Sequence, residues 1–188
     1  ADMSKTAAVI LSSPRKGANS SALAVAMAEG FKEAGGSFEV VDLAGLNIAP
    51  CLACEACQRN GGKCVQVDGM QTVYPQVTKA DVLILATPVY WFNMSAQMKI
   101  FLDRCFAVAL SEDGSFAKKT IGLALAFGDI DPFASGAVNA IRCFQDICTY
   151  TGAKWGGCVY GSAMDRQILA KDDELMAKAK ETGKNLMG

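Results

Sequence analysis

Short apolar runs alternate along this chain with longer stretches in which apolar residues recur every three or four positions. The short runs predict five β-strands, at residues 6–11, 38–43, 81–86, 120–127 and 155–160. The longer stretches predict five helices, at residues 20–34, 68–78, 95–110, 132–150 and 172–187. Because strands that are apolar throughout are buried on both faces, the order predicts a doubly wound α/β fold. A five-stranded parallel sheet with helices on both faces is expected, as a single domain over residues 1–188.

The composition fits one well-buried domain and excludes several kinds of partner. The chain has 188 residues, 51% of them hydrophobic, and its 18 basic and 19 acidic residues give a net charge of −1. Because no basic stripe is visible, neither nucleic acid nor an anionic membrane surface is expected as a partner. No apolar run reaches the roughly 18 residues of a membrane span, and no signal peptide is recognised, so a cytoplasmic location is expected. The low charged fraction, 20%, favours an oligomer.

Four cysteines lie close together in a cysteine-rich loop at about residues 50–66, in the stretch CLACEACQRNGGKC. Cys51, Cys54, Cys57 and Cys64 have the spacing C-x2-C-x2-C-x6-C, with which a tight loop can wrap around a [4Fe–4S] cluster. Because the chain has no histidine, the only zinc site that competes is an all-cysteine one. Structural zinc, cysteines that merely pack in a loop, and disulfides are the alternatives. The remaining cysteines are expected in the core: Cys105, Cys143, Cys148 and Cys158.

A serine-rich loop follows the first predicted strand and leads directly into a helix. Its sequence, SSPRKGANSS at residues 12–21, contains neither GxGxxG nor GxxxxGK[ST], which disfavours a dinucleotide fold and a P-loop NTPase. Hydroxyls, backbone N–H groups and the cation of Arg15, placed at a helix N-terminus, suit a phosphate monoester. An ordinary turn with N-cap serines is the alternative for this segment.

Three consecutive aromatic residues, Tyr90, Trp91 and Phe92, come soon after the third predicted strand, at the edge where doubly wound domains bind ligands. Flat aromatic faces suit a planar heterocycle, and they also suit a subunit interface. The fourth predicted strand ends in another turn, at Gly128. A phosphate loop after the first strand and an aromatic loop after the third predict a mononucleotide, with FMN as the natural candidate.

Three segments together resemble the iron–sulfur flavoprotein branch of the NADPH-dependent FMN reductase family: SSPRKGANS, CLACEACQRNGGKC and ADVLILATPVYWFNMSAQMKIFLDR. The resemblance implies a flavodoxin-like fold with strand order 2-1-3-4-5, FMN bound near a subunit interface, and a homodimer or tetramer. It places the phosphate at Ser12, Arg15, Asn19, Ser20 and Ser21, and the ring at Pro88, Val89, Tyr90, Trp91, Phe92 and Asn93. Ser13, Gly17 and Gly128 complete the expected cofactor-binding set. The cluster would be bound by Cys51, Cys54, Cys57 and Cys64.

The leading hypothesis is a flavin-dependent oxidoreductase that transfers electrons between FMN and a [4Fe–4S] cluster, with a partner such as ferredoxin or NAD(P)H. Because no histidine is present as a general acid or base, the redox chemistry is left to cofactors. One alternative is an NAD(P)H-dependent FMN or quinone reductase without a cluster, and another is a non-enzymatic, zinc-stapled binding module. Asp103 and Arg104 are expected on a solvated or salt-bridged helix face.

Overall fold

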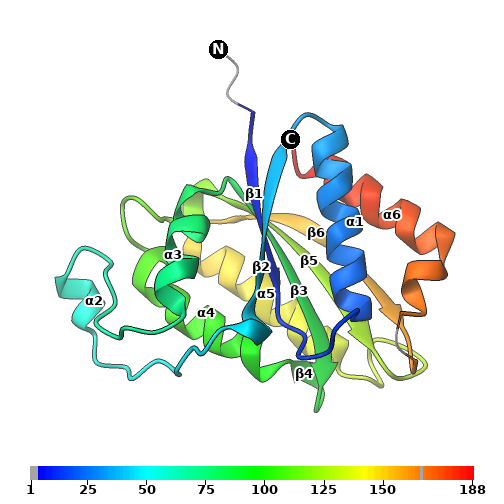
Figure 1. The fold of residues 1–188 in the computed structure, drawn as a ribbon, viewed down its shortest axis with the longest axis horizontal. Coiled ribbons are helices and arrows are strands. Elements are labelled where there is room, and N and C mark those ends of the chain that lie inside the picture. The colour runs from blue at the N-terminus through cyan, green and yellow to red at the C-terminus, as the bar shows by residue number, and fades with distance from the viewer. Residues whose placement is uncertain (1–3, 166) are drawn as a thin grey trace.

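Five parallel strands form the central sheet of the computed structural model, which describes residues 4–165 and 167–188 (Figure 1). These strands are β1 (Thr6–Leu11), β2 (Ser37–Asp42), β3 (Val82–Tyr90), β5 (Thr120–Phe127) and β6 (Lys154–Ser162). Their spatial order is β2-β1-β3-β5-β6, which is the predicted order 2-1-3-4-5 of the parallel strands. A short strand, β4 (Asn93–Met94), pairs antiparallel with the end of β3. The predicted flavodoxin-like α/β fold is confirmed.

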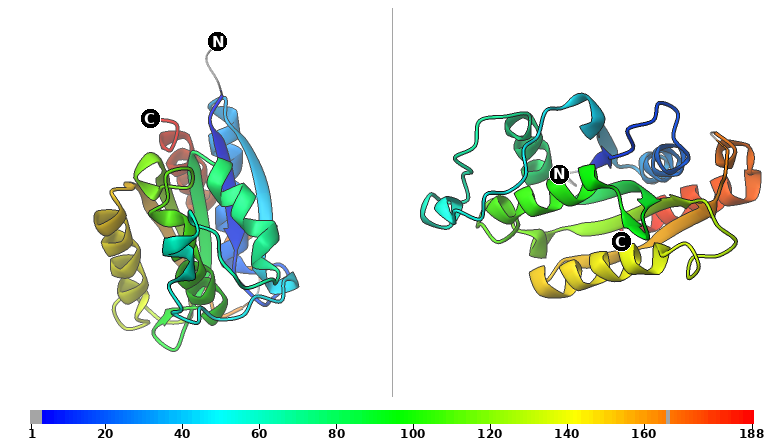
Figure 2. Two further views of the ribbon diagram at one scale, coloured as in Figure 1. Left: turned by 90° about the vertical axis from the view of Figure 1, so that its left-hand side faces the viewer. Right: turned by 90° about the horizontal axis from the view of Figure 1, so that it is seen from below.

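Helices cover both faces of this sheet (Figure 2). One face carries α1 (Asn19–Glu33) and α6 (Asp173–Asn185), and the other carries α3 (Met70–Lys79), α4 (Ala96–Ala109) and α5 (Ala137–Thr151). The short elements are α2 (Ala56–Arg59) and 3₁₀ helices at Leu43–Gly45, Phe116–Lys118 and Leu169–Lys171. Across residues 4–165 and 167–188, no helix is long and apolar enough to cross a membrane.

The central strands are apolar at every position because successive side chains enter opposite helical layers. In β3, Leu83 and Leu85 pack into the core beneath α3, α4 and α5. Their neighbours Ile84 and Ala86 pack into the core beneath α1 and α6. The sequence pattern of an uninterrupted apolar run therefore arises from two cores that share one sheet.

The third strand differs from its prediction, because β3 continues to Tyr90 rather than ending at residue 86. Val89 and Tyr90 pair with Met94 and Asn93, so the expected aromatic loop is a β-hairpin with the two-residue turn Trp91-Phe92. Both turn residues have positive φ, 49° at Trp91 and 66° at Phe92, as in a type I′ turn. Side chains other than glycine, asparagine or aspartate are strained there, and such strain persists only where the surroundings enforce it.

The fifth helix also begins later than predicted, at Ala137 rather than at Pro132. The carboxylate of Asp131 accepts hydrogen bonds from the N–H groups of Phe133 (2.7 Å) and Ala134 (2.9 Å), which folds this segment into a turn. Gly136 then adopts a φ of 78° immediately before the helix. Any Cβ at Gly136 would collide with Phe92, so this turn supports the hairpin between β3 and β4.

Candidate functional site

A cavity of about 300 Å³ opens where β1, β3 and β5 end, and it is referred to below as the strand-end cavity. Eight residues of the predicted cofactor-binding set line it: Ser13, Arg15, Asn19, Ser20, Pro88, Val89, Tyr90 and Gly128. The parallel order of the sheet brings them together, since the carboxyl ends of parallel strands share one edge. The volume lies at the lower end of the usual range for small-molecule sites.

Ser20 is the residue of this cavity whose surroundings most clearly suit an anion. It lies in the first turn of α1, is 1% exposed, and its hydroxyl oxygen has no hydrogen-bond partner in the described part of the chain. Ala18 at the N-cap supplies no side-chain cap, and the first turn of α1 contains no acidic residue. A buried hydroxyl without a partner is costly, and the positive end of a helix dipole favours an anion. The residues present therefore fit a phosphate group.

The rim of the strand-end cavity is formed by Arg15 and Tyr90. The guanidinium carbon of Arg15 lies 5.9 Å from the centre of the Tyr90 ring, within the range of a cation–π contact. The hydroxyl of Ser13 accepts a hydrogen bond of 3.2 Å from the backbone N–H of Arg15 and shapes this turn. Gly17 follows with a φ of 65°, a left-handed backbone conformation that favours glycine.

The side chain of Asn19 forms hydrogen bonds that hold a neighbouring segment in place. Its side-chain nitrogen donates to the carbonyl of Asp165 (2.8 Å), and its side-chain oxygen accepts from the N–H of Leu169 (3.1 Å). The segment so held, after β6, contributes Ala163, Met164 and Asp165 to the cavity. Sequence reasoning missed these three residues because they belong to no motif. The available signal was topological: β6 is parallel to β5 and ends at the same edge.

The remaining predicted cofactor residues do not line the strand-end cavity. Ser12 is fully buried, and its hydroxyl donates to the carbonyl of Ala86 (2.8 Å) and lies 2.9 Å from the Ser95 hydroxyl. This serine thus fastens the loop to β3 and to the start of α4. The others outside the lining are Gly17, Ser21, Trp91, Phe92 and Asn93. Their roles toward a cofactor stay predictions.

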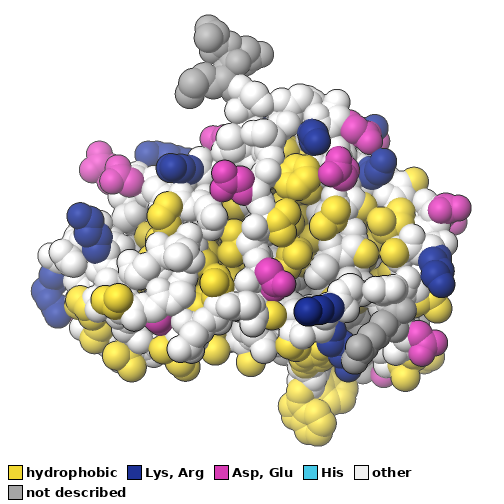
Figure 3. All heavy atoms as spheres, in the orientation of Figure 1, with side chains coloured by type: hydrophobic (Ala, Val, Ile, Leu, Met, Phe, Trp, Pro, Cys, Tyr) yellow, Lys and Arg dark blue, Asp and Glu magenta, His cyan; other side chains and the backbone are white. Residues whose placement is uncertain are grey.

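The hairpin tip projects from the molecule beside this cavity (Figure 1), and hydrophobic side chains form its end (Figure 3). Trp91 is 93% exposed and Phe92 is 56% exposed. The tip is nevertheless anchored, because the side-chain amide of Asn139 on α5 donates to the carbonyl of Phe92 (3.0 Å). Two large apolar rings are thus presented to solvent on a supported, strained turn.

A second cavity, of about 570 Å³, lies beside the cysteine-rich loop and is referred to below as the cysteine cavity. All four cysteines of the motif line it: Cys51, Cys54, Cys57 and Cys64. Residues of α4 and of the end of α5 complete the lining. The loop extends away from the sheet on the side of α3 and α4 (Figure 1). Among the described residues, this cavity and the strand-end cavity have no lining residue in common.

The cysteines of the loop are free thiols, and three of their sulfur atoms accept hydrogen bonds. The donors are the N–H of Ala53 to Cys51 (3.4 Å), the amide of Gln58 to Cys57 (3.9 Å) and the guanidinium of Arg104 to Cys64 (3.6 Å). Ala53 and Glu55, on either side of Cys54, have left-handed backbones with φ of 50° and 55°. Donors aimed at sulfur and strained backbone are features of ligand-binding loops. Within residues 4–165 and 167–188, no three acidic, cysteine or histidine side chains converge as a metal-ion site.

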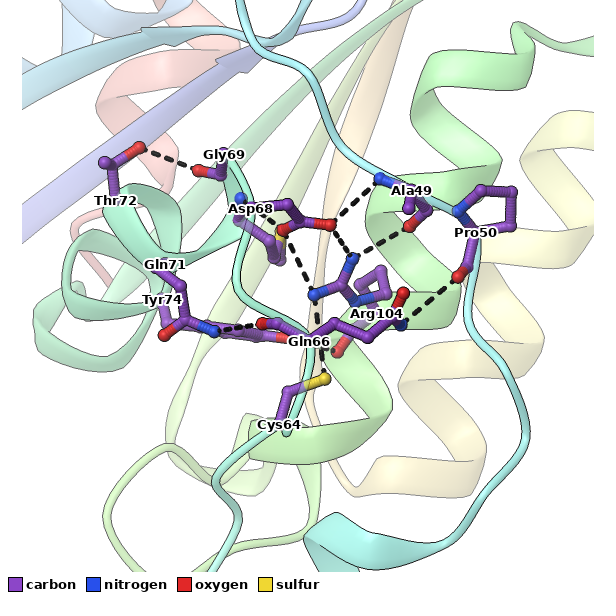
Figure 4. A network of polar contacts seen from close by, with 11 residues as sticks. Ala49, Pro50, Cys64, Gln66, Asp68, Gly69, Gln71, Thr72, Tyr74 and Arg104 are labelled. Carbon is purple, nitrogen blue, oxygen red and sulfur yellow. Dashed lines mark hydrogen bonds and ion pairs between the residues drawn. The ribbon is translucent and has the colours of Figure 1, made fainter.

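The side chain of Arg104 on α4 is completely buried beside this loop (Figure 4). It forms an ion pair with Asp68, with Nη1 lying 2.6 Å from Oδ2, and donates to the carbonyl of Ala49 (2.8 Å). The expected salt bridge is therefore present, but the expected solvated position is wrong, because the loop and the segment before α3 close over the guanidinium. Asp103 does lie on the exposed face, where it pairs with Lys99 (2.7 Å).

These surroundings lower the pKa values of Cys64 and Asp68. Burial alone would raise the pKa of Cys64, but hydrogen bonds from Gln66 and Tyr74 and the charge of Arg104 outweigh it and lower the pKa. Burial likewise opposes the lowered pKa of Asp68, which hydrogen bonds from Arg104, Ala49 and Met70 produce. Cys64 and Asp68 are thus held toward their charged forms.

The other four cysteines behave differently from those in the loop. Cys105 and Cys148 are buried, as predicted, whereas Cys143 and Cys158 are only partly buried. Burial raises the pKa of each of the four, that of Cys148 to about 11. These thiols stay protonated near neutral pH, whereas the pKa of Cys64 is lowered.

Comparison with known proteins shows the family of this chain. The model of the NADPH-dependent FMN reductase family matches residues 6–140. An "Iron-sulfur flavoprotein" of Methanosarcina thermophila is 39% identical over 119 residues, which are 63% of this chain and 61% of that protein. A protein of the same name from Archaeoglobus fulgidus is 33% identical over 171 residues, 88% of this chain and 86% of its own length. The chain thus spans about three fifths of the Methanosarcina protein.

Among solved structures, the "NAD(P)H:quinone oxidoreductase from Methanothermobacter marburgensis" has a similar fold. Its TM-score to this chain is 0.74, over 97% of this chain and 96% of the other, at 20% sequence identity. At that identity the likeness shows the shared flavodoxin-like architecture.

The Asp68–Arg104 ion pair predicts a pH-dependent stability. Replacing Asp68 with Asn should lower the free energy of unfolding by about 3 kcal/mol at pH 7, because it leaves the buried guanidinium without a counter-charge. The folded pKa of Asp68 lies below its unfolded value. Its stabilisation is therefore complete above a pH of about 4 and is lost as pH falls through the folded pKa. Urea unfolding at pH 7 and at about pH 3 measures this, and the gap between wild type and variant should shrink at the lower pH.

The matched control for this prediction is Asp103→Asn, since Asp103 pairs with Lys99 on an exposed face. It should cost less than about 1 kcal/mol at either pH. Equal losses from the two substitutions at pH 7 would contradict the importance of the buried pair.

Proposed function

Because this chain belongs to the NADPH-dependent FMN reductase family, we propose that it is a flavin oxidoreductase that binds FMN in the strand-end cavity. We further propose that the four clustered cysteines bind a [4Fe–4S] cluster, and that the protein transfers electrons between the two groups. The observation that carries the FMN assignment is the buried, unpartnered hydroxyl of Ser20 at the start of α1. The observation that carries the cluster assignment is that all four cysteines line one cavity.

The phosphate of FMN would be bound by the loop that runs from Ser13 to the first turn of α1. Ser20 would donate its hydroxyl hydrogen bond to a phosphate oxygen, and the helix dipole would favour the dianion. Arg15, at the rim, would add a positive charge. The ring would lie against Pro88, Val89 and Tyr90, which line the same cavity. These assignments leave Asn19 and Ser12 as supports of the loop rather than as ligands.

The spacing of the four cysteines favours a cluster over a single metal ion. One tetrahedral zinc would draw its sulfur ligands to within about 3.8 Å of each other, as Zn–S distances of about 2.3 Å require. In a cluster, by contrast, each cysteine binds a separate iron atom, so the four sulfurs surround a wider space. The names of the Methanosarcina and Archaeoglobus relatives agree with this assignment.

The chemistry of electron transfer is supplied by the cofactors: FMN when bound takes up electrons in pairs and releases them singly, and an iron–sulfur cluster exchanges one at a time. The chain holds and shields these groups. Sulfur-directed donors from Ala53 and Arg104 would stabilise negative charge at the cysteine ligands. Family membership gives no support to the alternative of a zinc-stapled binding module that lacks flavin.

An NAD(P)H-dependent FMN or quinone reductase without a cluster is the second candidate, favoured by the family name and by the fold shared with the Methanothermobacter enzyme. In that case NAD(P)H would be the reductant, and the cysteines would have a structural role. The two candidates differ in whether the pure protein contains iron and in whether its turnover needs it.

We also propose that the chain forms a homo-oligomer through the hairpin tip. Trp91 and Phe92 are exposed on a strained turn that Asn139 holds in place, an arrangement suited to docking against a second copy. Ile130 and Phe133, 88% and 78% exposed, lie in the turn that supports the tip. Because the tip borders the strand-end cavity, a second copy there would also shield a bound flavin.

Replacing Ser20 with Ala is expected to weaken FMN binding about 10- to 100-fold, since it removes one hydrogen bond to a charged group. Riboflavin, which lacks the phosphate, should bind both forms equally. Quenching of flavin fluorescence in a titration measures both affinities. The control is Ser37→Ala, because Ser37 begins β2 and lies outside both the cavity lining and the predicted cofactor-binding set. Equal losses for FMN and riboflavin would show that Ser20 does not contact the phosphate.

Anaerobically purified protein is expected to contain about four iron atoms and one FMN per chain. Replacing Cys54 with Ala should remove most of the iron while the flavin absorbance remains, because the two cavities are lined by different residues. Cys143→Ala is the control, because it also leaves seven of the eight cysteines but keeps the cysteine loop intact. Rapid oxidation of NADPH with a quinone by iron-free wild-type protein would instead favour the reductase without a cluster.

Replacing Trp91 with Ser should convert the oligomer into smaller species, because it removes the most exposed aromatic side chain from the proposed interface. Sedimentation-velocity ultracentrifugation measures the change. Val67→Ser is the control, since Val67 is equally exposed, at 93%, but lies after the cysteine loop. A monomeric wild type, or an unchanged assembly of the Trp91 variant, would contradict the proposed interface.

A further inference from the structure

We propose that Arg104 is a positioning residue of the four-cysteine site, which fixes the two stems of the cysteine loop and donates a charged hydrogen bond to the sulfur of Cys64. This inference rests on the proposed cluster and adds to it a role for a residue outside the cysteine motif. The guanidinium comes from α4, 40 positions after Cys64 in the sequence. Sequence spacing alone gives no reason to connect the two.

The geometry of the guanidinium supports this role (Figure 4). Nη1 lies 2.8 Å from the carbonyl of Ala49 and 2.6 Å from Oδ2 of Asp68, and Nη2 lies 3.2 Å from Oδ1 of Asp68. Ala49 is just before Cys51, and Asp68 is soon after Cys64. One planar group therefore joins the chain entering the loop to the chain leaving it. From the same group, Nη2 also reaches Cys64 Sγ at 3.6 Å.

Asp68 strengthens this junction from the other side. Its Oδ2 accepts the N–H of Ala49 (3.0 Å), and its Oδ1 accepts the N–H of Met70 (2.9 Å) at the start of α3. The carboxylate thus connects the first stem, the second stem and the helix that follows. With both partners largely or fully buried, the contacts cannot be exchanged readily for water. The fork of an arginine fits this set of acceptors, whereas the single ammonium of a lysine does not.

The burial of this charge is better explained by function than by stability. A buried ion pair contributes little net stability over apolar residues of the same shape. Arg104 is also imperfectly satisfied, because its Nε is buried and has no acceptor in the described part of the chain. What the pair provides is a fixed positive group beside the cysteine cavity, on whose lining Arg104 itself lies. Hydrogen bonds to a ligand sulfur hold the ligand in place and raise the reduction potential of an iron–sulfur cluster.

Two variants test the proposal in the full-length, anaerobically reconstituted protein. Arg104→Gln should lose iron to a chelator at least about 10-fold faster than wild type, and its cluster should have a more negative reduction potential. The reduction potential of Arg104→Lys should fall less than that of Arg104→Gln, because lysine retains a positive charge. This variant should still lose iron faster than wild type, because a lysine cannot join both stems. Iron release is followed by absorbance, and the potential by redox titration with electron paramagnetic resonance. Arg142→Gln, in an exposed ion pair on α5 outside the cysteine cavity, is the control and should match wild type in both measurements.

The outcomes separate this inference from the proposed function. FMN content and thermal unfolding of each variant show whether the fold is retained, and Arg104→Lys provides the test if Arg104→Gln does not fold. If wild type holds iron and both Arg104 variants match it in iron release and potential, the role of Arg104 alone is overturned. A change in iron release without a change in potential would overturn the hydrogen bond to Cys64. Wild-type protein that binds no iron would overturn the cluster and this inference together.

Discussion

The pairing of β1 with β3 is the constraint on which the strand-end cavity depends. The register places Leu11 beside Ala86, so β1 ends at this level while β3 continues to Tyr90. Ser12 then binds the carbonyl of Ala86 through its backbone N–H (3.1 Å) and its hydroxyl, and approaches Ser95 at the start of α4. This buried junction sets where the serine loop and the hairpin begin. The position of each group that faces the cavity from these two segments therefore depends on this junction.

The cysteine loop depends on a different kind of interaction. It contains little regular structure beyond the four residues of α2, and two of its cysteines are exposed. Hydrophobic burial therefore contributes less to its shape than polar contacts at its stems, where Arg104 and Asp68 hold the chain. Ala53 and Glu55 have left-handed backbone conformations, which are strained for these residues. Such strain persists only where the surrounding contacts hold the ends of the loop. The strand-end cavity thus depends on strand pairing and the Ser12 junction, whereas the cysteine loop depends on a buried ion pair.

Most of the fold could be predicted from the sequence because apolar runs and helical spacing are local signals. The parallel α/β architecture, the serine loop at the start of α1 and the burial of Cys105 follow from them, whereas the strand order came from the family resemblance. What could not be predicted depends on distant partners. Ser12 faces inward because its hydroxyl contacts that of Ser95. Arg104 is buried because a loop that lies 40 to 55 positions earlier in the sequence folds over it. The Trp91-Phe92 turn was missed because hairpin turns with positive φ ordinarily carry asparagine or glycine.

The separation of the two cavities has an evolutionary consequence. Because they share no lining residue in the described part of the chain, mutations that alter one leave the walls of the other unchanged. Descendants of such a protein can exchange, shorten or abandon the thiol-bearing segment while selection continues to act on the strand-end cavity. A lineage can therefore gain or lose the proposed cluster while the proposed flavin site is retained.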